Sequence, residues 1–323
     1  MGWGHLDADE FMPSPEAVER LQFEIDAYNA RRPEISREKD RRKALYMGGM
    51  AAVFVGLTLV GWAVIADFDL LSGWGFAWGV LCAVSLLGAH AVAVGPAQKF
   101  QQHLRSTLFS GLFPFIQDLK YRHRAQPLSY PRLPAAAAGR HNRRSFDDVI
   151  SGTYNGFSFE LYEAHLKVKS GKSSARTVFQ GVVVGFQGPR RFPGTLIATK
   201  AVGEVSRFLR DLFGGGGLEA VKSGDALLDT TYEFRSDMPD IARPLVNGDF
   251  ARALDWMREA WPGEPARVAL RGDDVFLLMP MKKNCFELPA IGVPLSYEAH
   301  VRPIAAELAA IMATAALVRK AIA

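Results

Sequence analysis

The chain has 323 residues, 49% of them hydrophobic, and a formal net charge of +4. This length suffices for one or two domains with sizeable cores, so it argues against a disordered chain. Its two cysteines, Cys82 and Cys285, exclude a disulfide framework and fit a reducing compartment. The small basic excess suits an anionic membrane surface as well as a nucleic acid, so charge alone does not choose the partner.

Residues 1–43 are expected to form a cytoplasmic segment with an amphipathic helix. Ser14 and Pro15 are a helix-start signal. Apolar residues then recur at spacings of three and four: Val18, Leu21, Ile25 and Tyr28. This stripe can pack on the chain's own domain or on a separate partner, and the sequence leaves both alternatives open.

Residues 44–95 are predicted to form a transmembrane helical hairpin. Two uncharged apolar runs, 44–66 and 73–95, are each long enough to cross a hydrocarbon core of about 30 Å at 1.5 Å per residue. A cleaved signal peptide and two buried helices of a soluble protein are the alternatives. A polar leader of more than about 40 residues disfavours the signal peptide, and paired spans with one-sided basic flanks disfavour the buried helices.

Basic residues flank this hairpin on one side only. Seven precede the first run and two follow the second: Arg31, Arg32, Arg37, Lys39, Arg41, Arg42, Lys43, Lys99 and Arg105. The connecting loop has none, so both termini are expected to be cytoplasmic. Arg41, Arg42, Lys43 and Lys99 are predicted to contact the head groups of an anionic lipid bilayer.

Residues 96–145 are expected to form a juxtamembrane helix and a basic linker. The helix starts at Pro96, and its apolar residues recur every four positions: Phe100, Leu104, Leu108, Leu112 and Ile116. Three prolines then precede a basic stretch that predicts an irregular linker: Pro127, Pro131, Pro134, Arg140, His141, Arg143 and Arg144.

Residues 146–323 are predicted to form an α+β domain on the cytoplasmic side. Strands 149–154 and 157–168 flank Asn155-Gly156, a sequence favoured by two-residue hairpin turns. Further strands are expected at 177–186 and 195–199, joined by a turn at 188–194, and near 218–221 and at 229–234. Strands 267–270 and 275–279 are expected to form a hairpin with its turn at 271–274. Helices are expected at 205–212, 239–246, 250–261 and about 303–321. Grouped strands with helices outside them indicate an antiparallel sheet with packed helices.

Several short motifs in a fixed order carry a family resemblance. They are LFPFIQDLKY at 112–121, GTYNGFSFELYEAHL at 152–166, VFQG at 178–181 and YEFRSD at 232–237. With the paired spans, they resemble the bacterial membrane proteins catalogued as domain of unknown function 3137. The glycine run 214–217 and the basic linker depart from that family. The resemblance implies a multi-pass protein of the bacterial inner membrane, and it carries no catalytic residue over.

No motif in the sequence reaches the strength of a catalytic, cofactor or metal site. Gly171-Lys172-Ser173 lacks the earlier glycine of a phosphate-binding loop, and the histidines have no metal-ligand spacing. We therefore predict no catalytic, cofactor-binding or metal-binding residues. The basic residues of the domain more simply contact anionic lipid than nucleic acid: Arg122, Arg124, Arg140, Arg143, Arg144, Arg190 and Arg191.

The sequence favours a membrane-tethered cytoplasmic binding or scaffold module. Its protein partner stays unknown, and a homo-oligomer is possible. The alternative is a membrane-associated enzyme whose site assembles only in the fold, drawing on Asp148, His141 or Cys285. A concave pocket that holds several of these residues would favour the enzyme. A transporter is disfavoured because two spans without buried charge offer no pathway.

Overall fold

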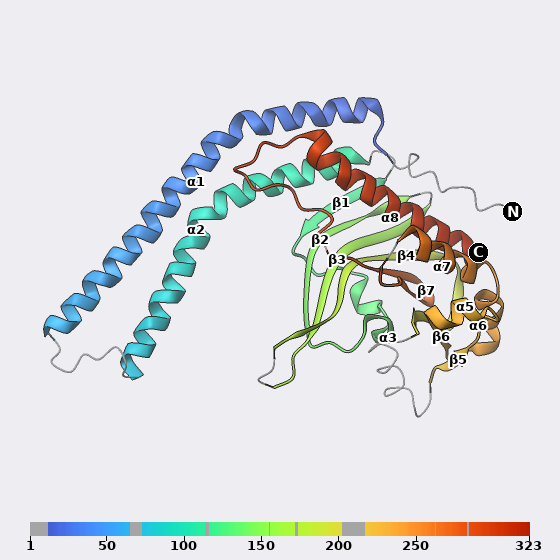
Figure 1. The fold of residues 1–323 in the computed structure, drawn as a ribbon. Helices are drawn as coiled ribbons and strands as arrows, with labels where there is room; N and C mark the ends of the chain where they lie inside the picture. The colour runs from blue at the N-terminus through green and yellow to red at the C-terminus, as the bar shows by residue number, and fades with distance from the viewer. Residues whose placement is uncertain are drawn as a thin grey trace. The chain divides into compact units, whose positions relative to one another are not determined.

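The computed structural model describes residues 12–64, 73–113, 116–154, 156–171, 174–201, 217–261, 263–282 and 284–323. The predicted helix 205–212, the glycine run 214–216, Asn155 and the loop between the two apolar runs lie outside these residues. The chain divides into two compact units (Figure 1). The sheet unit comprises Met1–Val18, Phe109–Glu287 and Arg302–Ala323, and the helical unit comprises Glu19–Leu108 and Leu288–Val301.

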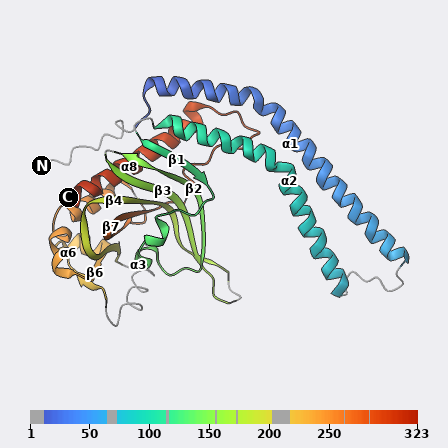
Figure 2. The same ribbon diagram turned by 180° about the vertical axis from the view of Figure 1, so that it is seen from behind.

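Two long helices dominate the helical unit: α1 (Pro15–Val64) and α2 (Gly73–Leu112). Each was predicted as two separate pieces. Pro33 lies inside α1 and Pro96 lies inside α2, so neither proline begins or ends a helix. A proline removes one backbone hydrogen bond, which bends a helix without ending it when the flanking residues remain helical. Both helices are bent in the two ribbon views (Figures 1 and 2).

The two helices contact each other within the helical unit. Trp78 Nε1 donates a hydrogen bond of 3.1 Å to Thr58 Oγ1, and the Trp78 ring meets Phe54 edge to face. Towards the other end, the rings of Tyr28 and Phe100 stack with centroids 5.0 Å apart. A Cβ atom added at Gly79 would meet nothing within 4 Å, so this glycine does not mediate a close helix approach.

Residues 288–301 dock on the helices of the helical unit. Asn29 exchanges two hydrogen bonds with the backbone of Leu295, at 2.7 and 2.9 Å, and Arg32 Nη1 donates to the carbonyl of Gly292 at 2.8 Å. Three of the four residues of the predicted apolar stripe, Leu21, Ile25 and Tyr28, are buried within the chain, and Val18 is half-buried. This burial favours packing of the stripe on the chain itself.

Within the part of the chain that the structure describes, three helical stretches are long and apolar enough to cross a membrane. They are Pro15–Ala63, Gly75–Leu112 and Tyr297–Ala321, with hydropathies of 1.8, 1.9 and 1.6 in their most apolar windows. The protein buries 0% of the first window, 6% of the second and 67% of the third. The third stretch was predicted as an ordinary helix of the domain, and its burial agrees with that role.

The sheet unit contains an antiparallel sheet of seven strands. They are β1 (Gln117–His123), β2 (Arg143–Tyr154), β3 (Phe157–Val168), β4 (Arg176–Lys200), β5 (Glu219–Val221), β6 (Tyr232–Ser236) and β7 (Arg267–Pro280). Their order is β1-β2-β3-β4-β6-β5, and β7 pairs along the other edge of β4. The predicted α+β class with an antiparallel sheet is confirmed.

Short and medium helices complete the sheet unit. They are η2 (Tyr130–Arg132), α3 (Ala135–Ala138), α5 (Ala226–Thr231), α6 (Pro239–Val246), α7 (Asp249–Ala260) and α8 (Arg302–Ala321). The short helix η3 (Tyr297–Val301) precedes α8 in the chain and belongs to the helical unit. Arg319 of α8 lies over the ring of Phe157, whereas Tyr162 belongs to the core cluster beside α3. Because side chains alternate along β3, α8 and α3 cover opposite faces of the sheet.

Two predicted turns are wrong, because β4 and β7 run through them. The predicted turn 188–194 lies inside β4, and the predicted turn 271–274 lies inside β7. The pairing of these two strands shifts register between Gln187 and Thr195, where Phe192 faces Gly272. The glycines and Pro193 therefore mark bulges in two strands that bend together.

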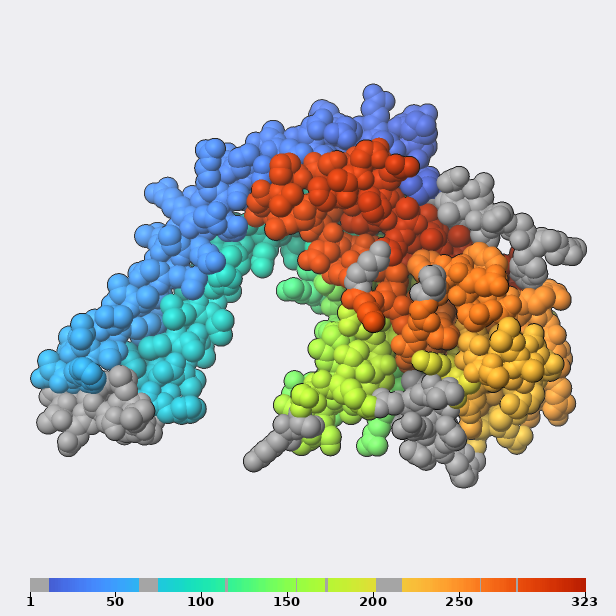
Figure 3. Space-filling view, viewed as in Figure 1, coloured from blue at the N-terminus to red at the C-terminus, as the bar shows by residue number. Residues whose placement is uncertain are grey.

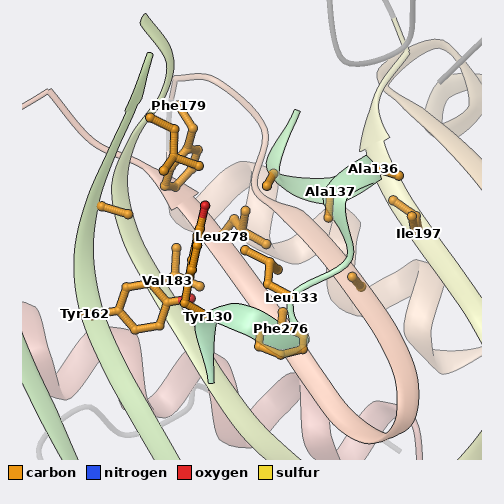
Figure 4. Close-up of a cluster of buried hydrophobic side chains, with 14 of the residues drawn as sticks. Tyr130, Leu133, Ala136, Ala137, Tyr162, Phe179, Val183, Ile197, Phe276 and Leu278 are labelled. Atoms are coloured by element: carbon orange, nitrogen blue, oxygen red, sulfur yellow. The ribbon is translucent and has the colours of Figure 1, made fainter. Parts of the chain in front are cut away.

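The predicted helix through Ile116 and the predicted irregular linker also need correction. Helix α2 ends at Leu112, and β1 follows as an edge strand. Pro114 has no N–H to continue a helical ladder. Arg143 and Arg144 belong to β2, and residues 130–138 form part of the core instead of a linker. Figure 4 shows Tyr130, Leu133 and Ala137 among side chains of the sheet: Tyr162, Val183, Phe276 and Leu278.

Candidate functional site

A bulge in β2 gathers acidic side chains at one place on the sheet. The β2 residues on either side of the bulge pair regularly with β3, so Asp147 and Asp148 both lie opposite Glu163. Two residues facing one is the arrangement by which a bulge re-aims side chains. His123, the last residue of β1, pairs with Asp148 from the other side. Three strands thus contribute to one cluster of three carboxyl groups and one imidazole.

The histidine lies within hydrogen-bonding distance of both aspartates. His123 Nδ1 is 3.1 Å from Asp147 Oδ1 and 3.2 Å from Asp148 Oδ1. Asp148 is fully buried and also accepts a short hydrogen bond from the hydroxyl of Tyr121. One donor atom from each of His123, Asp147 and Asp148 lies within 4.8 Å of the others, so this group can hold a metal ion.

The carboxyl of Glu163 is the most perturbed acid beside this cluster. Burial, with a smaller contribution from the negative charges of Asp148 and Asp147, raises its pKa to about 7 against the lowering effect of a hydrogen bond from the backbone. That hydrogen bond joins Cys285 N to Glu163 Oε1 at 2.7 Å. A carboxyl with a pKa near 7 is suited to exchange protons at neutral pH.

A cavity of about 660 Å³ opens beside these groups. Its lining includes cationic, acidic and neutral polar side chains: Arg124, Arg144, Asp147, Glu163, His165 and Asn284. Arg124 has a positive φ of 52°, and its N–H donates to the carbonyl of Asp147 at 2.9 Å. Such a φ is uncommon for a residue other than glycine, and strained backbone of this kind gathers at functional sites.

The structure brings only part of the predicted enzyme site together. Asp148 belongs to the cluster, and Cys285 is buried and reaches Glu163 through its backbone N–H. His141 instead contacts the Tyr130 hydroxyl, and its Nδ1 lies 2.7 Å from the carbonyl oxygen of Gly139.

Sequence reasoning missed two members of this site, His123 and Glu163. The signal in the sequence was the adjacent pair Asp147-Asp148, which directly precedes the predicted strand 149–154 and marks a bulge in β2.

The predicted lipid contacts lie on the two long helices. Arg41, Arg42 and Lys43 are on α1, and Lys99 is on α2. Arg41, Lys43 and Lys99 are exposed, while Arg42 Nε lies 2.7 Å from Glu38 Oε1 one turn earlier. Their contact with lipid stays a prediction. In the sheet unit, Arg122 pairs with the buried Glu160 at 2.6 Å, so this arginine already has a partner within the protein.

Comparison with known proteins identifies a family. Residues 177–319 match the family described as "Protein of unknown function (DUF3137)". None of the curated proteins compared matches the chain. A crystal structure of the mycobacterial trehalose monomycolate transport factor A, TtfA, shows 10% identity and a TM-score of 0.34 over 61% of this chain and 88% of that chain. A likeness of that degree carries no argument. The match to the DUF3137 family covers residues 177–319, less than half of the chain.

Proposed function

We propose that this protein is a membrane-anchored binding module. In this proposal, α1 and α2 insert as a two-span hairpin into the bacterial inner membrane, with both termini cytoplasmic, and the sheet unit binds a ligand or partner there. One observation carries the anchor: the most apolar windows of the two helices are 0% and 6% buried by the protein. A soluble monomer rarely exposes so large a contiguous apolar surface.

The exposed side chains support a lipid environment for these helices. On α1 they include Val53, Val55, Leu57, Leu59, Val60 and Trp62, and on α2 Phe76, Val80, Leu81, Val84, Leu87 and Val92. Removing one such side chain from water is worth about 1.5–3 kcal/mol. Arg41, Arg42, Lys43 and Lys99 then lie near the ends of the spans, where anionic head groups attract them.

The cavity of the sheet unit supports the binding role. It combines charged and neutral polar side chains from β2, β3 and β4 with the apolar surface of Phe146 and Ala164. Concave sites with a few convergent polar groups are the usual location of ligands.

Membrane extraction and topology reporters test the anchor. After lysis and alkaline carbonate washing, the full chain is expected in the membrane pellet, because an inserted hairpin resists charge-disrupting washes. A reporter active only in the cytoplasm is expected to work when fused after Ala323 and to fail when inserted after Ser72. Recovery of the chain in the supernatant would overturn the anchor, and the reverse reporter pattern would overturn the orientation.

A membrane-associated enzyme is the second candidate function. The observation that favours it is a cavity beside a cluster of four ionisable residues, His123, Asp147, Asp148 and Glu163. The fold brings these residues together from three different strands. The cluster can orient a cation or a polar substrate while Glu163 transfers a proton. This candidate predicts stoichiometric Mn²⁺ or Zn²⁺ binding to the purified full chain in calorimetry. His123→Gln should abolish it, and the matched change Asp273→Asn, outside the cluster, should not.

A further inference from the structure

The strand register places basic side chains opposite one another at one corner of the sheet unit. Arg143 of β2 pairs directly with Lys167 of β3, and Arg176 of β4 pairs with Val168 next to Lys167. We call this surface the basic corner. It consists of Arg140, Arg143, Arg144, Lys167, Lys169 and Arg176. Like charges directly opposite each other destabilise an antiparallel pair, so this arrangement has a cost within the folded chain.

The basic corner is open to solvent and held in place. Arg140, Arg143, Arg144 and Arg176 are exposed. The guanidinium of Arg144 lies 5.3 Å from the centroid of the Tyr130 ring. Figure 3 shows the residues around the β3–β4 turn, in yellow-green, at the molecular surface.

Two hydrogen bonds between the side chain of Asn142 and the backbone of Lys169 fix the spacing of the strand ends at this corner. Asn142 Nδ2 donates to the carbonyl of Lys169 at 2.8 Å, and Lys169 N donates to Asn142 Oδ1 at 2.9 Å. The charges are therefore arranged before any partner arrives.

The acids nearest along these strands are already engaged. Asp147 lies 3.1 Å from His123 Nδ1, and Glu163 accepts a hydrogen bond from Cys285 N. The corner thus keeps a positive excess that an anionic partner would neutralise.

We propose that the basic corner docks on the anionic phospholipids of the membrane that anchors the chain. This inference rests on the proposed anchor, because tethering keeps the sheet unit at a high effective concentration near the bilayer. Each added basic residue then strengthens attraction to anionic head groups. Single-stranded nucleic acid is the weaker partner, since the aromatic rings beside the corner, Tyr130, Phe146 and Phe179, are buried or half-buried and offer no exposed stacking surface.

Protease protection of the full chain in lipid nanodiscs tests this docking. Discs of phosphatidylcholine are compared with discs that contain about one third phosphatidylglycerol, and the rate of trypsin cleavage within residues 169–175 is followed by mass spectrometry. We expect cleavage about threefold or more slower in the anionic discs, and we expect high salt to remove the difference because it screens surface charges. Equal rates in both discs would overturn the proposal.

Two double variants distinguish the corner from net charge and from misfolding. Arg143→Gln with Lys167→Gln should abolish the lipid difference without lowering the melting temperature, because it also removes a like-charge pair. Arg190 and Arg191, which the sequence alone grouped with the lipid-contacting arginines, lie on β4 outside the basic corner at exposed positions. Arg190→Gln with Arg191→Gln removes the same charge and should preserve the difference. Loss of the difference in this control would overturn the assignment of lipid binding to the basic corner. Slower cleavage on addition of transfer RNA to neutral discs, without any effect of anionic lipid, would also overturn it.

Failure of the anchor would be visible separately. A chain that leaves the discs would refute the hairpin and not the corner. Co-sedimentation of the released chain with vesicles of the same two compositions would then decide the role of the corner, and equal sedimentation with both would refute it.

Discussion

Helix α8 and the two long helices α1 and α2 are nearly equal in hydropathy and opposite in burial. The most apolar window of the stretch that contains α8 has a hydropathy of 1.6, against 1.8 and 1.9 for the windows of α1 and α2. The protein buries 67% of the first and 0% and 6% of the others. Hydropathy alone therefore does not distinguish these helices. Tertiary packing does, because the protein covers most of the apolar window of α8 and leaves those of α1 and α2 exposed.

Helices α1 and α8 each contain a threonine that makes the same kind of hydrogen bond to a tryptophan. In α1, Thr58 Oγ1 donates to the carbonyl of Phe54 at 2.7 Å and accepts a hydrogen bond from Trp78 Nε1 at 3.1 Å. In α8, Thr314 Oγ1 donates to the carbonyl of Ala310 at 2.7 Å and accepts from Trp261 Nε1 at 3.1 Å. A tryptophan–threonine hydrogen bond therefore joins α1 to α2 in one unit and α8 to the residue after α7 in the other. The two helices differ in how much of their apolar surface the protein covers, and not in this contact.

The largest expected effect comes from placing a charge in each helix. Ile311→Asp buries an unpaired carboxylate in α8, since Ile311 is 0% exposed, and should destabilise the sheet unit by about 4 kcal/mol or more. Leu57→Asp in α1 should leave the thermal unfolding of the sheet unit unchanged and weaken membrane insertion by about 3 kcal/mol. A lower melting temperature from Leu57→Asp would contradict the assignment of α1 to lipid.

Truncation of a leucine gives the next effect. Leu308 in α8 is 1% exposed, and Leu308→Ala should lower the free energy of unfolding by about 2–5 kcal/mol through lost burial and a cavity. The same substitution at Leu57, 51% exposed in α1, should change the stability of the sheet unit by less than about 0.5 kcal/mol. Denaturant unfolding of the two variants measures the contrast, and equal losses would refute it.

The pH dependence of stability reports on the sheet unit, through the partly buried carboxyl group of Glu163. The pKa of Glu163 is raised from 4.5 to about 7 in the folded chain, so folding favours its protonated form. The stabilisation is present below pH 4.5 and is lost as the pH rises through 7, at a cost of up to about 3 kcal/mol.

Glu163→Gln should remove this decline. Thermal unfolding of the sheet unit between pH 5 and pH 8 tests it, with Glu233→Gln on β6 as the control that keeps the decline. A parent protein whose stability rises over this range would contradict the raised pKa.

The smallest effect belongs to the paired threonines. Thr314→Val deletes a hydroxyl that makes two hydrogen bonds in the core and should lower the stability of the sheet unit by about 1 kcal/mol. Thr58→Val should leave that unit unchanged and weaken the contact between α1 and α2. Trp78 fluorescence in lipid discs reports the second change, and an unaltered spectrum would argue against the Thr58–Trp78 contact.

Much of the fold could be predicted where local patterns agree with the final pairing. The bounds of β3 and α6 match those predicted, at 157–168 and 239–246. Alternation and helical spacing are properties of short stretches, so these elements are visible without their neighbours. The continuous β4 and β7 were not predictable in this way, because a glycine or proline within a stretch marks either a turn or a bulge, and the facing strand decides which.

The candidate site depended on long-range pairing. His123 meets Asp148 only because residues 117–123 form an edge strand, whereas the sequence had predicted only a helix and an irregular linker in the region 96–145. Glu163 joins them because the bulge sets two aspartates opposite it. No spacing motif joins residues brought together in this way, which is why a sequence search for metal or catalytic signatures found none.

By itself, the sequence determined that the chain has two long apolar runs with basic flanks, an α+β domain and a family likeness, because hydropathy, periodicity and short motifs are carried by neighbouring residues. Only the tertiary structure decided that α8 belongs to the protein core, that β4 and β7 are single bent strands, and that His123, Asp147, Asp148 and Glu163 form one cluster beside a cavity. These features arise from contacts between residues far apart in the chain, whose energies no local pattern records.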